Sequence, residues 1–202
     1  MIKNVIFDFG QVLVRFEPKY MTEEFVKDEN DSLLLQEVLF DRLYWDRLDL
    51  GTISDNELVA EACTRLPERL HGVAAKIYEN WIYNLPETYG MDALVTELKE
   101  KYGVRLFLLS NISRTFSAHH KEIPILRHFE KCIMSANYGA VKPSREIFDI
   151  LCAECGIKKE ESIFIDDSEK NVRGACEYGI SAYLFDGDAE RLKGYLFDLL
   201  SK

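Results

Sequence analysis

The sequence predicts an α/β fold, a doubly wound parallel sheet that carries an inserted helical cap domain. Short apolar runs end abruptly in polar residues, and the first of them, Val5-Ile6-Phe7, stops at Asp8. From about residue 92, further apolar runs alternate with helical patterns, which is typical of strands joined by right-handed parallel crossovers. One strand, then a long helical stretch, then the rest of the sheet indicates an insert after the first strand.

The inserted stretch has its own helix signals. Apolar residues between 25 and 48 recur at roughly helical spacing. Ser54 followed by Glu57 is typical of a capping box, which predicts a helix from there through Leu66. Pro67 marks a break, and another helix is expected to follow it.

The core elements follow the first strand and this insert in chain order, and a glycine just past each helix is the expected C-cap. We expect strands over residues 3–8, 104–109, 131–135, 162–165 and 182–184, and helices over 68–83, from Asp92 to Gly103, near 114–121, from Ser144 to Gly156 and up to Gly179. The predicted cap is residues 16–88, and the predicted core is residues 1–15 and 89–202.

Composition excludes several classes of protein. The net charge of −10 disfavours binding to nucleic acid or to anionic membranes, since both need a basic surface. No apolar run approaches the roughly 20 residues that span a bilayer, and the N-terminus does not resemble a signal peptide. A cytoplasmic location is therefore expected. The five scattered cysteines are expected to be reduced thiols. Oligomeric state is left open.

Two acidic sites follow apolar strands. Asp8 is a candidate nucleophile that attacks phosphorus and forms an aspartyl-phosphate, although an acid here could simply form a turn. A carboxylate that attacks a phosphate dianion needs a divalent cation nearby. Asp166 and Asp167 are candidate ligands for Mg²⁺, which prefers oxygen atoms. The alternative for this pair is a helix N-cap. Asn171, one helical turn further on, could hold a neighbouring ligand.

Three further polar residues complete the candidate phosphoryl-transfer site. Ser110 and Asn111 follow the strand at 104–109 and could bind phosphate ahead of a helix, or could only cap that helix. Lys142 precedes Pro143 and could neutralise the phosphoryl oxygens and Asp8, or could be a solvated loop lysine. All these groups occur in chain order on the carboxyl side of one predicted sheet.

This set of motifs resembles the haloacid dehalogenase-like (HAD) superfamily of hydrolases. The matches are Asp8-Phe9-Gly10-Gln11-Val12 at the first motif, Ser110 at the second, Lys142 in Val-Lys-Pro-Ser at the third, and Asp166-Asp167 with Asn171 at the fourth. The insert resembles the helical-cap subclass, and Asp-x-Gly, Leu-Ser-Asn and Phe-x-Asp-Asp resemble the bacterial α-D-glucose-1-phosphate phosphatase group.

The resemblance implies a HAD-like Rossmannoid core and a Mg²⁺-dependent phosphatase of a small phosphorylated metabolite, a sugar phosphate being one candidate. It implies that Asp8, the Gly10 carbonyl and Asp167 hold Mg²⁺, with Asp166 as a ligand or a supporting acid. It also implies that Ser110, Asn111 and Lys142 bind the phosphoryl group.

Gly10 departs from the family pattern. The family usually has a second aspartate there, which acts as general acid and lends its backbone carbonyl to the metal. The carbonyl remains in this chain, but the acid does not. General acid catalysis contributes roughly 10²–10⁴-fold to rate, so another group must supply the proton or the leaving groups must be better. Glu17 is one candidate, with a solvated hinge residue as the alternative.

Other functions and features stay open. A 2-haloacid dehalogenase would use the same nucleophile without metal, a phosphomutase would need proton transfer to and from a second hydroxyl, and a sensor or scaffold would bind phosphate without turnover.

Cys152 and Cys155 are expected to pack in a helix rather than bind zinc. His119 and His120 are expected at the surface or in caps. Tyr44 and Trp45 are expected to pack between cap helices, although one aromatic ring could face a sugar.

Overall fold

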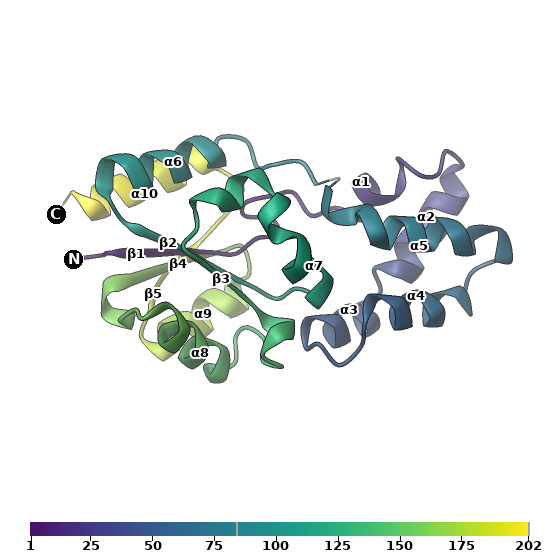
Figure 1. Cartoon of the computed structure of the whole chain (residues 1–202). Coiled ribbons are helices and arrows are strands. Elements are labelled where there is room, and N and C mark those ends of the chain that lie inside the picture. The colour runs from purple at the N-terminus through teal and green to yellow at the C-terminus, as the bar shows by residue number, and fades with distance from the viewer. Residues whose placement is uncertain (84, 202) are drawn as a thin grey trace.

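A five-stranded parallel sheet forms the centre of the core, with the strand order β3-β2-β1-β4-β5 (Figure 1). The computed structural model describes residues 1–83 and 85–201. The strands are β1 (Asn4–Phe7), β2 (Arg105–Ser110), β3 (Lys131–Met134), β4 (Ser162–Asp166) and β5 (Ser181–Leu184). The chain builds outwards from β1 first to one side and then to the other. The predicted doubly wound α/β fold is therefore confirmed.

Helices cover the sheet and extend beyond it. The α-helices are α1 (Pro18–Thr22), α2 (Glu29–Leu39), α3 (Arg42–Asp49), α4 (Asp55–Cys63), α5 (His71–Asn80), α6 (Met91–Tyr102), α7 (Arg114–His119), α8 (Arg145–Cys155), α9 (Glu169–Tyr178) and α10 (Ala189–Leu200). Short 3₁₀ helices are η1 (Glu68–Leu70), η2 (Trp81–Tyr83), η3 (His120–Glu122), η4 (Pro124–His128), η5 (Ser135–Asn137) and η6 (Lys159–Glu161).

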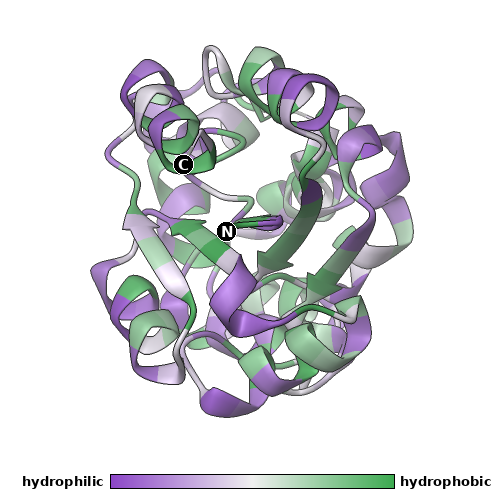
Figure 2. Cartoon of the chain, turned by 90° about the vertical axis from the view of Figure 1, so that its left-hand side faces the viewer, coloured by the Kyte–Doolittle hydropathy of each residue, from purple (hydrophilic) through white to green (hydrophobic). Residues whose placement is uncertain are grey.

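Helices bury both faces of the sheet. Side chains of a strand point alternately to opposite faces, so neighbouring residues of one strand enter different core clusters. Val5 and Phe7 of β1 belong to the core cluster under α6 and α10, whereas Ile6 belongs to the cluster under α8 and α9. In Figure 2 the central strands are largely green and one strand is paler, whereas much of the outer helical surface is purple. Strands buried on both faces explain why their sequences are continuous apolar runs rather than alternating ones.

Helices α1 to α5 lie together beyond the carboxyl ends of the strands, at the right of Figure 1. The chain enters and leaves this group side by side. The Arg15 amide donates to the Pro86 carbonyl at 2.8 Å, and the Thr88 amide donates to the Leu13 carbonyl at 2.9 Å. The group of helices α1 to α5 is called the cap below. The division at 16–88 remains a prediction.

Local signals predicted helix ends well. The Ser54–Glu57 capping box is present with both of its hydrogen bonds, although α4 ends at Cys63 rather than at Leu66. Gly103, Gly156 and Gly179 each follow a helix with a left-handed backbone, as expected of C-caps. Helix α10 was not predicted, although its start is capped by the Asp188 side chain, which accepts from the Arg191 amide.

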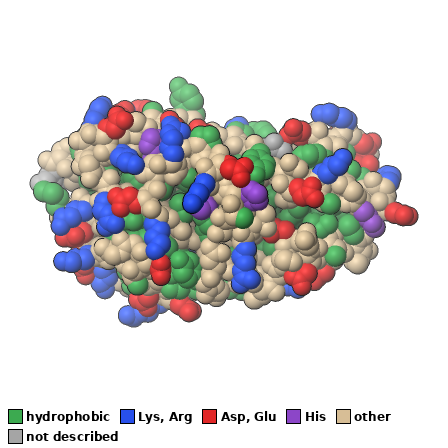
Figure 3. All heavy atoms as spheres, in the orientation of Figure 1, with side chains coloured by type: hydrophobic (Ala, Val, Ile, Leu, Met, Phe, Trp, Pro, Cys, Tyr) green, Lys and Arg blue, Asp and Glu red, His purple; other side chains and the backbone are tan. Residues whose placement is uncertain are grey.

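The outer surface carries charges of both signs. Lys and Arg side chains are interspersed with Asp and Glu over the face shown in Figure 3. Within residues 1–83 and 85–201, no helix combines the length and the apolarity that crossing a bilayer requires.

Candidate active site

The carboxyl ends of the three central strands bring the predicted acids together. Asp8 directly follows β1, and its backbone amide donates to the Ile165 carbonyl of β4 at 2.9 Å. Asp166 is the last residue of β4, and Asp167 follows it. Because β1 pairs in parallel with both β2 and β4, side chains just after these strands share one edge of the sheet.

Lys142 joins two of these acids. Its Nζ lies 2.8 Å from Asp8 Oδ1 and 2.7 Å from Asp166 Oδ2, and all three side chains are buried. Burial alone would lower the pKa of Lys142, but the charges of Asp8 and Asp166 outweigh it, and the pKa is raised. Burial raises the pKa of Asp8 to about 7, while the charge of Lys142 opposes the rise and that of Asp166 adds to it.

Asp166 has no exposed surface, and both of its oxygens accept hydrogen bonds. Oδ1 accepts from the Ser168 amide at 2.8 Å and from Asn171 Nδ2 at 3.0 Å. Oδ2 accepts from Lys142 Nζ, and Asn171 Nδ2 also lies 3.1 Å from it. Asn171 therefore holds Asp166 in place. Asp166 in turn fixes the side chains of Lys142 and Asn171 and the backbone at Ser168.

Three carboxylates offer a site for a divalent cation. One oxygen each from Asp8, Asp166 and Asp167 lies within 4.8 Å of the other two. This donor set fits Mg²⁺, which prefers carboxylate oxygens and keeps several waters. Asp167 is exposed and has room for a ligand, and burial followed by the charge of Asp166 raises its pKa. Asp166 already accepts several hydrogen bonds, so Asp8 and Asp167 are the more available oxygens.

Asn111 contacts the backbone of Lys142. Its Oδ1 accepts from the Lys142 amide at 2.7 Å, and its Nδ2 donates to the Lys142 carbonyl at 3.2 Å. The side-chain amide therefore fixes the backbone of Lys142, and Asn111 also lines the cavity described below. Ser110 is buried at the end of β2 and does not line the cavity described next.

A cavity of about 320 Å³ opens above Asp8. Its core side includes Asp8, Gly10, Asn111, Lys142 and Asn171. Its cap side includes Phe16, Arg42, Trp45 and Asp49, and Lys170 of α9 also lines it. Glu17, the suggested replacement acid, does not line this cavity.

Arg42, Asp49 and Lys170 line the cavity but were not among the predicted site residues. A signal was available, because Arg42, Trp45 and Asp49 recur at i, i+3 and i+7, which places them on one face of α3. Trp45 packs in the cap as expected, where its Nε1 donates to the Leu39 carbonyl at 2.9 Å, and it also faces the cavity.

The remaining features lie away from the site. His119 Nδ1 contacts Glu122 at 3.0 Å, and His120 Nδ1 lies 2.8 Å from the Ser117 carbonyl. Cys155 is buried against the sheet and Cys152 packs beside it. Neither pair lines the cavity.

Comparisons with known proteins agree with this geometry. Residues 2–179 match the haloacid dehalogenase-like hydrolase family. The chain is 26% identical to a D-ribitol-5-phosphate phosphatase from Bacteroides thetaiotaomicron, over 94% of this chain and 95% of that protein.

Two solved structures share the fold. A HAD-like family hydrolase from Porphyromonas gingivalis is 25% identical, with a TM-score of 0.73 over 100% of this chain and 99% of that one. A HAD family enzyme from Bacteroides thetaiotaomicron, in complex with magnesium and inorganic phosphate, is 28% identical, with a TM-score of 0.69 over 95% and 99% of the two chains. The chain belongs to the haloacid dehalogenase-like hydrolase family, as the motifs at Asp8, Lys142 and Asp166-Asp167 indicate.

Proposed function

We propose that the protein is a Mg²⁺-dependent phosphatase that hydrolyses a small phosphorylated metabolite. The observation that carries this proposal is the cluster in which Lys142 bridges Asp8 and Asp166 beside Asp167. A carboxylate nucleophile, a fixed cation and a further acid for a metal are the groups that phosphoryl transfer needs. The phosphatase activity named for the ribitol phosphate relative supports the same reaction type.

The proposed reaction has two steps at Asp8. A carboxylate oxygen of Asp8 attacks phosphorus, and the bond from phosphorus to the leaving-group oxygen breaks. Water then attacks phosphorus in the aspartyl-phosphate, which releases inorganic phosphate and restores the Asp8 carboxylate. Lys142 stabilises the negative charge on the phosphoryl oxygens and on Asp8.

Asp8, the Gly10 carbonyl and Asp167 would hold the metal, and Asp166 with Asn171 would support them. Bound Mg²⁺ would offset the charge of the phosphate and favour the ionised form of Asp8. The cap, residues 16–88 in our division, would cover the substrate and exclude bulk water.

The test is a hydrolysis screen across sugar phosphates, alditol phosphates, nucleotides, FMN and acyl phosphates, with magnesium and with EDTA. We expect phosphate release that EDTA abolishes. We also expect Asp8→Asn to remove turnover, a loss of roughly 10⁴-fold or more. Asp186→Asn, which neutralises an exposed acid paired with Arg191, is the matched control and should keep full activity.

Each rival function has a distinct result in this screen. Halide release from 2-haloacids in EDTA would indicate a dehalogenase. Turnover that requires a sugar bisphosphate activator would indicate a phosphomutase. Phosphate binding without turnover of any ester would contradict the enzyme assignment.

A further inference from the structure

Hydrolysis of an alkyl phosphate leaves a strongly basic alkoxide, which needs a proton as the ester bond breaks. Gly10 lines the cavity but has no side chain to donate one. Within the part of the chain that the structure describes, Asp8 and Asp49 are the two carboxylic acids that line this cavity. Asp8 is occupied as the nucleophile, so Asp49 is the acid that remains.

Asp49 has the surroundings of a proton donor. Asp49 as a whole is 7% exposed, and its Oδ1 is buried without a hydrogen-bond partner among the described residues. Burial raises the pKa of Asp49 to about 7, with the charges of Arg42 and Lys142 opposing the rise and that of Asp46 adding to it. Such a carboxyl keeps a substantial protonated fraction at neutral pH.

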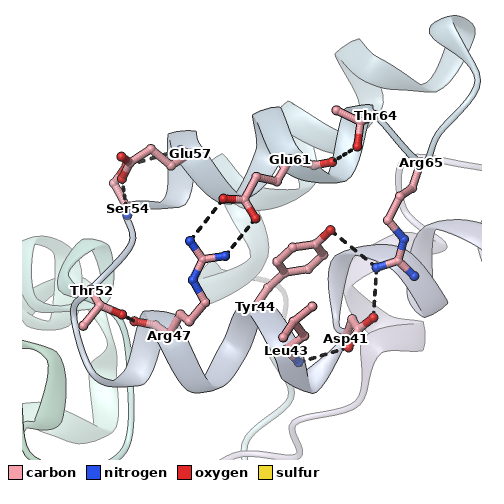
Figure 4. A network of polar contacts seen from close by, with 10 residues as sticks. All are labelled: Asp41, Leu43, Tyr44, Arg47, Thr52, Ser54, Glu57, Glu61, Thr64 and Arg65. Atoms are coloured by element: carbon pink, nitrogen blue, oxygen red, sulfur yellow. Dashed lines mark hydrogen bonds and ion pairs between the residues drawn. The ribbon is translucent and has the colours of Figure 1, made fainter.

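Several contacts hold Asp49 in place from the cap side. Asp49 is the last residue of α3, and Figure 4 shows the polar contacts that fasten this helix to α4 and beyond. Arg47 donates to both oxygens of Glu61, at 2.8 and 3.1 Å, and Arg65 donates to Asp41 at 2.9 Å.

Other contacts fasten the same end of α3 to the core. Ser135 Oγ donates to the Asp49 carbonyl at 2.6 Å and accepts from the Ile112 amide at 2.9 Å. Gly51 lies so close to the core that an added Cβ would sit 2.3 Å from the Ala136 carbonyl oxygen. A side chain held from both sides keeps the fixed geometry that proton transfer requires.

We infer that Asp49, a residue of the cap, is the general acid that protonates the leaving-group oxygen. In an in-line displacement the leaving oxygen lies opposite the attacking Asp8, and hence on the cap side of the phosphoryl group. The proton moves from the Asp49 carboxyl to the leaving oxygen as the ester bond breaks. The Asp49 carboxylate then regains its proton from solvent, and the water that attacks the aspartyl-phosphate carries its protons into the released inorganic phosphate. This inference rests on the proposed phosphatase function.

The test compares two classes of ester in the full-length protein with magnesium. The alkyl ester is whichever of D-ribitol 5-phosphate, D-glucose 6-phosphate and glycerol 3-phosphate turns over fastest. The second ester is 2,4-dinitrophenyl phosphate, whose leaving group departs without a proton. For Asp49→Asn we expect kcat on the alkyl ester to fall by about 10²–10³-fold. We expect kcat on the dinitrophenyl ester to stay within about threefold, because that step gains little from an acid.

The pH profile gives a second readout that a purely structural role would not move. The wild-type kcat on the alkyl ester should fall as pH rises through about 7, since the acid form of Asp49 is lost there. That fall should be absent for the dinitrophenyl ester. The charged and titratable groups around Asp49 are Arg42 and Asp46 of α3, Tyr78 of α5, and Asp8, Lys142 and Lys170 of the core.

Glu37→Gln, which neutralises an exposed acid elsewhere in the cap, is the control and should leave both rates unchanged. An equal loss of kcat on both esters, or no loss on either, would overturn the role of Asp49 while the phosphatase function stands. If the wild-type protein hydrolyses neither ester, the phosphatase function itself fails.

Discussion

The two sides of the cavity differ in how fully their polar groups are paired. The floor, defined as Asp8, Lys142 and Asp166, is buried, and each of its residues has an ion-pair or hydrogen-bond partner at 2.7–2.8 Å. The roof, defined as Arg42, Trp45 and Asp49, contains a carboxylate oxygen without a partner among residues 1–83 and 85–201. Its arginine side chain pairs with Asp46 but is 79% exposed. The floor is thus organised before substrate arrives, whereas the roof keeps polar groups available for the variable part of a substrate.

Replacing the buried lysine of the floor is the most severe test of its organisation. Lys142→Met leaves Asp8 and Asp166 buried without their ion pair, so we expect a loss of about 3–5 kcal/mol in the free energy of unfolding. Turnover should fall by at least about 10²–10³-fold. Urea denaturation and phosphate release measure the two effects.

Lys170→Met is the control for this prediction, because Lys170 also lines the cavity but is exposed. Its unfolding free energy should change by less than about 0.5 kcal/mol. If both lysine variants lose the same stability, the floor is not the more tightly organised side.

The seating of the roof on the core can be tested at Gly51. Its φ is +68°, and an added Cβ would lie 2.3 Å from the Ala136 carbonyl oxygen. Gly51→Ala should therefore lower the free energy of unfolding by about 2–4 kcal/mol, from backbone strain and overpacking together. Thermal and chemical denaturation would report it.

Gly103→Ala separates the two causes. Gly103 has a φ of +63°, but nothing lies within 4 Å of an added Cβ. Its cost should be only the backbone strain, about 1–2 kcal/mol. Equal costs at the two glycines would show that the contact between cap and core adds nothing.

A smaller effect is expected where the floor is held indirectly. Asn111→Ala removes both hydrogen bonds to the Lys142 backbone, so we expect kcat to fall by about 10–100-fold, as for other residues that orient a catalytic group. Steady-state kinetics at saturating magnesium would measure it. Asn137→Ala, at an exposed amide bonded to Ser117, should leave kcat unaltered. A wild-type kcat in Asn111→Ala would indicate that Lys142 needs no such support.

The smallest effect concerns stability at the roof. Asp49 has a pKa of about 7 in the folded protein against 3.8 for the ordinary group, so stability is lost as pH rises from about 4 through 7. Asp49→Asn removes that loss and should raise the free energy of unfolding by about 1–2 kcal/mol at pH 8. At pH 4 the two proteins should be nearly equal. If Asp49→Asn is less stable than wild type at pH 8, the ionised Asp49 does not destabilise the folded protein.

The sequence predicted the floor better than the roof for a physical reason. Asp8, Ser110 and Asp166 each end a strand or follow one, and parallel pairing brings such positions together regardless of detail. Helix ends at Ser54 and Gly156 were predictable because capping depends on neighbours within a few residues.

The roof depends on contacts between distant segments. Asp49 faces the cavity because the end of α3 packs against Ser135 and Ala136 of the core. These contacts join segments far apart in the chain, and the spacing of residues within α3 does not predict them. The contact of Asn111 with the Lys142 backbone was not predicted for the same reason, since Lys142 lies 31 residues further along the chain. Helix α10, which was not predicted, does have a local signal in its Asp188 cap.

The central position of β1 also constrains how the protein can fold. This strand precedes its partners in the sequence, yet one neighbour starts about 100 residues later and the other contains Ser162, 158 positions from Asn4. Both edges of β1 are therefore paired only through contacts between distant segments, which are slow to form. The helices between β1 and β2 contact one another over much shorter separations and can form earlier. Asp8 and the Asp166-Asp167 pair consequently come together only when strands far apart in the sequence have paired, so their proximity reports the completion of the sheet.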